Sequence, residues 1–225
     1  MKASDTWDSE DDLEGMPKRL RGIYKWVRGF FYASAAGLVI MMIGCVFVFF
    51  TDYTGYNPDR DFMPPDIFKA IGSLIYLVAF IGGIIAFSMF TYRAMKNLHI
   101  WKNKYAEMLP GWTVGWYFIP FANLWKPYHA MEQIWTGTYH AISGKYEANG
   151  KVGLWWACWI FFYFTSGIGN AMSRWEGPWN IVLRRSAMVD LFSLSLGVLA
   201  ILIIMPVLKI IMERQDGKIE SHVFS

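Results

Sequence analysis

The chain has 225 residues, of which 55% are hydrophobic, 18% are aromatic and only 17% are charged. A soluble domain usually carries about 25% charged residues, and long stretches here carry none. This composition excludes an ordinary soluble domain and indicates that lipid is the solvent for part of the chain. The formal net charge is only +3, so the distribution of charge is more informative than its total.

The N-terminal 28 residues form an acidic stretch and then a basic one. Acidic side chains gather within the first 16 residues, and basic side chains follow between Lys18 and Arg28. The acidic stretch holds too few apolar residues to bury a core, so residues 1–28 are predicted to be a partly disordered tail. The basic flank beside a membrane span favours anionic lipid headgroups, and no nucleic acid is expected as a partner.

Four apolar runs are long enough to cross a membrane, which takes about 20 residues of helix. They cover residues 29–51, 67–92, 152–172 and 187–211. The predicted fold class is therefore an all-α membrane protein. It is a bundle of about four transmembrane helices over residues 29–212, followed by a short polar tail at 213–225.

The basic residues of the short loops predict the orientation, because Lys and Arg favour the cytoplasmic side. The flank before the first span and residues 93–104 are basic, whereas the loop 52–66 is acidic and rich in proline. We therefore predict a multi-pass membrane protein with both termini in the cytoplasm. The arginines between the third and fourth spans oppose this topology, and a crossing by residues 112–125 would place the C-terminus outside.

A proline-broken aromatic segment lies between the second and third spans. Its apolar part, residues 112–125, is too short for a comfortable crossing at about 1.5 Å of rise per residue. Pro120 and Pro127 also interrupt helical hydrogen bonding. We predict a re-entrant or interfacial element, or a kinked helix shielded by its neighbours, followed by an amphipathic helix on the membrane surface. Asn123, between the two prolines, is expected to bond to another helix, water or a ligand.

This segment and its flanks carry an unusual motif. Its candidate functional or structural residues are Arg93, Asn97, Trp112, Trp116, Pro120, Asn123, Trp125, Pro127, Tyr128 and Glu132. With these elements the chain resembles bacterial membrane proteins that carry domain of unknown function 4328. In that family a residue usually separates the methionine and the glutamate, which are adjacent here as Met131 and Glu132. The resemblance implies a multi-span helical domain and, since the family has no established activity, no particular function.

Three polar side chains have a simple structural interpretation and a functional one. Arg93 and Asn97 share a helix face, where Arg93 would reach the headgroups and Asn97 would cap the helix. Alternatively, they pair with Glu132 or with backbone freed by the prolines. Asp190, expected in the first turn of the fourth span, would favour the exposed N–H groups there. The alternative for Asp190 is an intramembrane proton or cation site.

The sequence carries no recognisable catalytic, metal-binding or phosphate-binding motif, so we expect neither a cofactor nor enzyme activity. The function that we favour is a non-catalytic accessory or partner-binding membrane protein, with a membrane-protein partner or a second copy as candidate partners. The alternative is a homo-oligomeric channel or small-solute transporter that uses the broken helix around Asn123, because broken helices occur at transport sites. A lipid-acting enzyme would rest only on His129 and Glu132.

Overall fold

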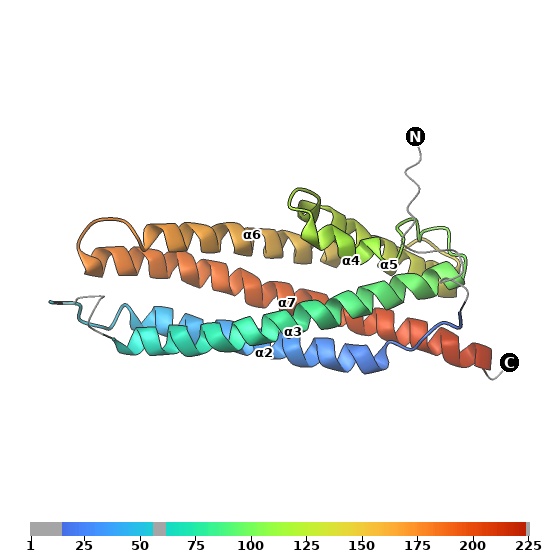
Figure 1. Cartoon of the computed structure of the whole chain (residues 1–225), viewed down its shortest axis with the longest axis horizontal. Coiled ribbons are helices and arrows are strands. Elements are labelled where there is room, and N and C mark those ends of the chain that lie inside the picture. The colour runs from blue at the N-terminus through green and yellow to red at the C-terminus, as the bar shows by residue number, and fades with distance from the viewer. Residues whose placement is uncertain (1–14, 56–61, 224–225) are drawn as a thin grey trace. The chain divides into compact units, whose positions relative to one another are not determined.

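The computed structural model describes residues 15–55 and 62–223, and within these ranges it holds helices and no strand (Figure 1). The predicted acidic stretch, up to residue 14, and part of the predicted loop 52–66 lie outside the described residues. The helices are α2 (Arg21–Phe47), α3 (Pro64–Ile100), α4 (Trp112–Gly115), α5 (Lys126–Ser143), α6 (Gly150–Met172) and α7 (Trp179–Val223). Two 3-10 turns, η1 (Trp116–Phe118) and η2 (Ala122–Leu124), separate α4 from α5.

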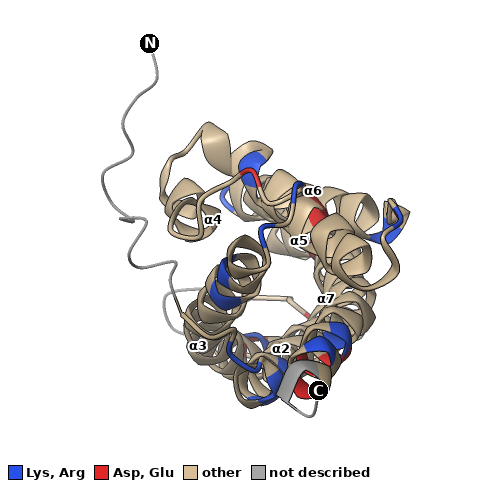
Figure 2. Cartoon of the chain, turned by 90° about the vertical axis from the view of Figure 1, so that its right-hand side faces the viewer, with Lys and Arg blue, Asp and Glu red and all other residues tan. Residues whose placement is uncertain are grey.

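Within the described residues four helices, α2, α3, α6 and α7, are long and apolar enough to cross a membrane, as predicted. α3 has 37 residues and α7 has 45. At about 1.5 Å of rise per residue they measure about 55 Å and 67 Å, well beyond a hydrocarbon core of about 30 Å. Both helices therefore continue past the predicted ends of the spans, and Figure 2 shows Lys and Arg along their charged ends.

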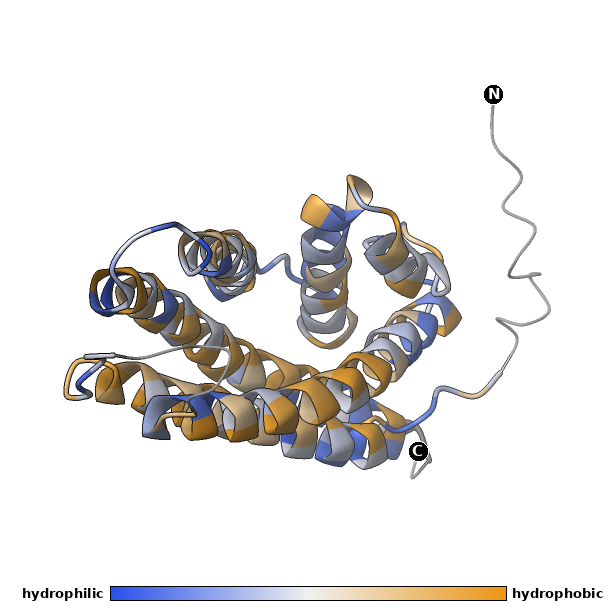
Figure 3. Cartoon of the chain, turned by 60° about the vertical axis from the view of Figure 1, so that its left-hand side comes forward, coloured by the Kyte–Doolittle hydropathy of each residue, from blue (hydrophilic) through white to orange (hydrophobic). Residues whose placement is uncertain are grey.

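The long helices turn large apolar side chains away from the protein. Leu74 of α3 is 64% exposed and Phe164 of α6 is 62% exposed. Figure 3 shows hydrophobic residues along the lengths of these helices. Such surface is unfavourable in water and favourable in hydrocarbon. The chain is accordingly a multi-span membrane protein, and the predicted all-α membrane fold is confirmed.

The chain divides into two compact units that are discontinuous in sequence. Unit 1 comprises residues 1–28, 83–153 and 203–225, and unit 2 comprises residues 29–82 and 154–202. Unit 2 is a bundle of parts of the four long helices, whereas unit 1 contains α4, α5 and the remaining parts of the long helices.

Unit 2 is held together by close backbone approach and by aromatic contacts. A Cβ atom on Gly37 of α2 would lie 2.8 Å from the carbonyl oxygen of Gly72 in α3, so both positions need glycine. Tyr76 of α3 packs edge-on against Phe162 of α6, with ring centroids 6.3 Å apart. Gly197 of α7 faces the same Phe162 ring, which connects α3, α6 and α7.

Unit 1 packs α5 against the late turns of α3. Nine residues of α5 are buried, and Met131 and Ile134 are fully so. Gly137 of α5 faces Leu98 of α3, where a Cβ would meet the leucine methyl at 2.7 Å. The prediction that the apolar face of this helix lies on the membrane surface is therefore wrong. α3 continues as a helix past its apolar run, and the face of α5 covers protein instead.

Candidate functional site

A buried network of polar side chains connects three helices of unit 1. Asn97 of α3 donates from Nδ2 to Oε1 of Gln215 in α7 at 2.9 Å. Gln215 donates from Nε2 to Oγ1 of Thr138 in α5 at 2.9 Å and to the carbonyl oxygen of Ala94 at 3.3 Å. Asn97 is 1% exposed, and Gln215 and Thr138 are fully buried. Every one of these amide groups is thus paired with another protein group.

The same network holds the segment that leads into α2. The amide of Asn97 forms two 2.9 Å hydrogen bonds with the backbone of Lys18, one to its N–H and one to its carbonyl. The Asp216 carboxylate accepts the N–H groups of Leu20 at 2.7 Å and Arg21 at 3.1 Å. Asp216 therefore caps the N-terminus of α2 from another helix, a role that satisfies otherwise unpaired donors.

Two expectations for this region are corrected. Asn97 does not cap α3, because the helix runs on to Ile100 and Asn97 faces Lys18 and Gln215 instead. Glu132 lies 3.6 Å from His129, one turn away on α5, and no pairing with Arg93 is found among the described residues. Arg93 itself is half-buried on α3.

Glu132 also influences the tyrosine of the motif. Burial, together with the charge of the Glu132 carboxylate, raises the pKa of the Tyr128 phenol. Because Tyr128 already stays protonated at neutral pH in its ordinary environment, this shift keeps it a neutral hydrogen-bonding group. His129 and Glu132 lie at the surface of α5, with side chains 51% and 38% exposed.

The proline-broken geometry predicted for the aromatic segment is confirmed. α4 and η1 bring Trp112 and Trp116 together with ring centroids 4.6 Å apart, and the ammonium group of Lys126 lies 4.9 Å over the Trp116 ring. Pro120 lies in the exposed turn that follows, where its missing N–H disturbs no helix. Pro127 is buried in the first turn of α5, a position that tolerates proline.

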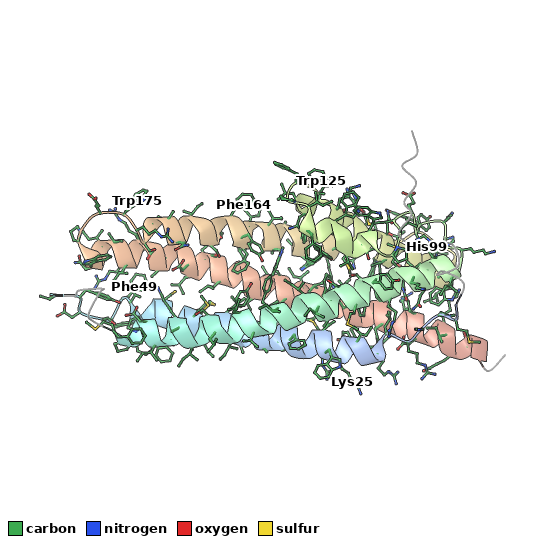
Figure 4. All side chains as sticks on the ribbon, viewed as in Figure 1. Lys25, Phe49, His99, Trp125, Phe164 and Trp175 are labelled. Atoms are coloured by element: carbon green, nitrogen blue, oxygen red, sulfur yellow. The ribbon has the colours of Figure 1, made fainter. Side chains whose placement is uncertain are left out.

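Several apolar side chains are exposed between the last residue of η1 and the start of α5. We call residues 118–125 the apolar loop. Phe118 is 75% exposed, Phe121 is 79% exposed and Trp125 is 47% exposed. Figure 4 labels Trp125 at this loop. Just before this loop, Tyr117 packs on Phe87 of α3, with ring centroids 6.3 Å apart. Phe87 lies in the apolar run of α3, so the apolar loop starts beside a membrane-spanning part of its own unit.

Asn123 is half-buried in η2. Its backbone N–H donates to the carbonyl oxygen of Ile119 at 2.8 Å, which stabilises the turn after Pro120. Across the ranges 15–55 and 62–223, its side-chain amide forms no hydrogen bond. The partner expected for this amide is thus not found within the described part of the chain.

Unit 2 contains a partly open cavity of about 280 Å³ near the C-terminal ends of α2 and α6 and the N-terminal parts of α3 and α7. Most of its lining surface is apolar, and two charged side chains, several hydroxyl groups and one amide lie in it. The lining residues are Met41, Cys45, Lys69, Ser166, Gly169, Asn170, Ser173, Leu183, Ser186, Asp190, Ser193 and Leu194.

Asp190 provides the carboxylate of this cavity. The sequence predicts it in the first turn of its helix, but α7 begins at Trp179, so Asp190 lies well inside the helix, away from its N-terminal N–H groups. Its Oδ2 atom is 3.8 Å from Nζ of Lys69 in α3. Gly169 of α6 makes room for the carboxylate, because a Cβ at this position would overlap Oδ1 of Asp190.

The serine hydroxyls direct their hydrogens into the protein. Ser193 donates to the carbonyl oxygen of Phe162 at 3.0 Å, so Ser166, whose Oγ lies 2.6 Å from that of Ser193, is the donor of their shared bond. Ser173, just after α6, and Ser186 of α7 likewise donate to the carbonyl oxygens of Asn170 and Leu183, at 2.9 Å and 3.0 Å. The hydrogens of these hydroxyls are therefore used within the protein, and any further bond that a hydroxyl forms is one in which it accepts.

Sequence reasoning misses most of the residues that build these two regions. It places Gln215 and Asp216 in a polar tail, although the apolar residues Ile211, Met212 and Ile219 around them keep helical spacing. Lys69 stands out in the sequence only as a charge near the start of a span. A lone Lys and a lone Asp in different apolar runs are the available signal, since intramembrane charges commonly pair.

Comparison with known proteins identifies the family of the chain. The family described as domain of unknown function (DUF4328) matches residues 64–212, about two thirds of the chain. No curated protein and no solved structure matches it. The matched range begins with α3 and ends within α7, so it includes the aromatic segment, Lys69 and Asp190.

Proposed function

Since the chain belongs to the DUF4328 family, whose description names no activity, we propose from the cavity of unit 2 and the two charges in it that the chain binds a small polar solute. The proposed class is a non-catalytic channel or small-solute transporter of the bacterial inner membrane. The observation that supports this proposal is the cavity itself, where Lys69 and Asp190 lie among hydroxyl groups between apolar helices. Charged groups are unfavourable within membrane helices, and where they occur they commonly line solute or ion pathways.

The cavity supports binding better than catalysis. No histidine lines it, and its one thiol, Cys45, shares the cavity with a single carboxylate, that of Asp190, which faces Lys69. The candidate acid and base of unit 1, His129 and Glu132, contact each other at the exposed surface of α5. A membrane enzyme would need such groups converging on one enclosed site.

Reconstituted protein tests the proposal. Flux of small polar solutes into liposomes, and solute-induced thermal stabilisation in nanodiscs, are expected for the wild type and lost in Asp190→Asn. Glu132→Gln, which changes a carboxylate of unit 1, serves as the matched control and should behave as the wild type. Equal solute responses in wild type and Asp190→Asn would contradict a solute site at this cavity.

The transporter hypothesis based on the broken helix centres on Asn123, which the cavity does not include. With the solute at Asp190, Asn123→Leu is expected to leave solute binding unchanged. Loss of solute binding in Asn123→Leu, together with unchanged solute binding in Asp190→Asn, would place the solute site at the broken helix instead of the cavity. Four spans rarely enclose a pathway alone, so transport would use several copies, which native mass spectrometry of the purified protein can count.

A second candidate function is an accessory role in which the apolar loop binds the transmembrane surface of another membrane protein. Exposed Phe118 and Phe121 favour it, because both belong to a segment that does not cross the membrane as a helix. A partner that co-purifies in equimolar amount with the wild type and is lost from Phe118→Ser/Phe121→Ser would support this role. Ile142→Ser, an exposed apolar position on α5, is the control.

The predicted topology places residues 15–28 and the loop after α3 in the cytoplasm and the turn after α2 outside. Cysteines introduced at Thr54 and Lys104 test it, because both native cysteines are buried. In intact cells a membrane-impermeant maleimide should label Thr54→Cys and not Lys104→Cys. The reverse pattern would invert the topology.

A further inference from the structure

Building on the proposed solute site, we propose that the cavity of unit 2 selects a small zwitterion of amino-acid size, with an ammonium group held by Asp190 and a carboxylate held by Lys69. Three features of the cavity support this ligand class: its balanced charge, its supply of hydrogen-bond acceptors and its size.

The charge of the cavity is balanced but loosely paired. Lys69 and Asp190 are 3.8 Å apart, beyond ordinary hydrogen-bond length, and their side chains remain 28% and 30% exposed. A simple anion or cation would leave one of the two charges with a like-charged neighbour. A zwitterion inserted between them gives each charge a new partner and keeps the cavity neutral, which is the cheapest state in a low-dielectric surrounding.

The hydroxyl groups complement an ammonium group. Ser166 and Ser173, which are half-buried, donate their hydrogens to protein acceptors, which leaves their lone pairs for a ligand. An ammonium group has three donors and no acceptor, so it matches this arrangement together with the Asp190 carboxylate. Lys69 supplies the donors that a ligand carboxylate needs.

The volume and the apolar lining of the cavity narrow the class of ligand further. A volume of about 280 Å³ falls just below the range of about 300–1,000 Å³ that is usual for drug-sized ligands. Met41, Leu183 and Leu194 provide an apolar wall against which a short aliphatic side chain can rest. A compact amino acid therefore fits within the cavity.

Gly169 contributes to the site because it has no side chain. Because a Cβ here would overlap Oδ1 of Asp190, Gly169→Ala forces the carboxylate to move while both charges stay in place. This substitution separates the position of the carboxylate from its charge.

Calorimetric titration of the full chain in nanodiscs tests the ligand class with glycine, L-alanine, acetate, ethylamine and glycerol as probes. Glycine and L-alanine are expected to bind at least ten-fold more tightly than the other three. Tighter binding of acetate, ethylamine or glycerol would overturn the zwitterion assignment and leave a solute site intact. Binding of none of the five would overturn the zwitterion assignment, and absence of solute flux in the liposome assay as well would overturn the solute site.

Variants identify the site. Lys69→Met, Asp190→Asn and Gly169→Ala are each expected to weaken L-alanine binding at least ten-fold, and Glu132→Gln to leave it unchanged. The charge-exchanged double variant Lys69→Asp/Asp190→Lys should recover most of the binding lost in the single variants. Gel filtration checks that each variant is folded. If folded single variants bind L-alanine like the wild type, the cavity is not the zwitterion site.

Discussion

The two units bury polar side chains in opposite ways. In unit 1, Asn97, Gln215 and Asp216 are at most 2% exposed, and each is hydrogen-bonded to other protein groups. In unit 2, Lys69 and Asp190 keep 28% and 30% of their side chains exposed beside a cavity. The polar groups of the network are hydrogen-bonded to other protein groups, whereas the charged pair lies beside a cavity that a ligand can enter.

This difference separates a structural role from a binding role. A buried polar network with every group satisfied makes the fold rigid and specific, and removing one member leaves the others without partners. A partly exposed ion pair contributes little to stability because solvent weakens it. We therefore expect substitutions in unit 1 to lower stability, and substitutions in the cavity to lower ligand binding.

The largest expected effect is on the network of unit 1. Gln215→Ala removes the partner of Asn97 and Thr138, and each buried polar group left unpaired costs about 1–3 kcal/mol. The free energy of unfolding should fall by about 3 kcal/mol, measured by denaturant titration in detergent micelles. Glu213→Ala, on an exposed position of the same helix, is the control. Equal stability of Gln215→Ala and Glu213→Ala would contradict a structural role of the network.

A somewhat smaller effect is expected where α2 and α3 meet in unit 2. Gly72→Ala places a Cβ 2.7 Å from the carbonyl oxygen of Gly37, and such overpacking typically costs about 1–3 kcal/mol. Gly167→Ala is the matched control, since a Cβ there meets nothing within 4 Å and alanine favours helix. Thermal unfolding should rank Gly72→Ala below the wild type and Gly167→Ala at or above it. The opposite order would contradict the close approach of these helices.

Asp190→Asn is expected to change stability less than either, by about 1 kcal/mol or less, because its ion pair with Lys69 is long and partly exposed. The same variant should lose the thermal stabilisation that L-alanine gives the wild type. A loss of several kcal/mol in the free energy of unfolding without ligand would show that this ion pair has a structural role, as the network of unit 1 has.

The smallest expected effect on stability comes from the apolar loop. Phe121→Ser changes a side chain that is 79% exposed, so the free energy of unfolding should shift by less than about 0.5 kcal/mol. Co-purification of the variant with a membrane partner is the informative readout. A large loss of stability would show that Phe121 packs within the protein rather than against its surroundings.

The sequence by itself determined the features that depend on a local run of residues. Each of the four spans is visible because a helix in lipid must be apolar over its whole crossing. Pro120 and Pro127 similarly indicate the broken segment, because proline removes a backbone donor wherever it stands. The residues of the aromatic motif, which are close together in the chain, also point to the family without any knowledge of how the helices pack.

Only the tertiary structure decided which polar residues meet. Nothing near Asp190 in the sequence indicates Lys69, and nothing near Asn97 indicates Gln215, because these partners lie on helices that are far apart along the chain. The same holds for α5, whose amphipathic pattern fits a membrane surface as well as a protein surface. Local sequence determines which face of a helix is apolar, and packing with distant helices determines what that face and its polar neighbours touch.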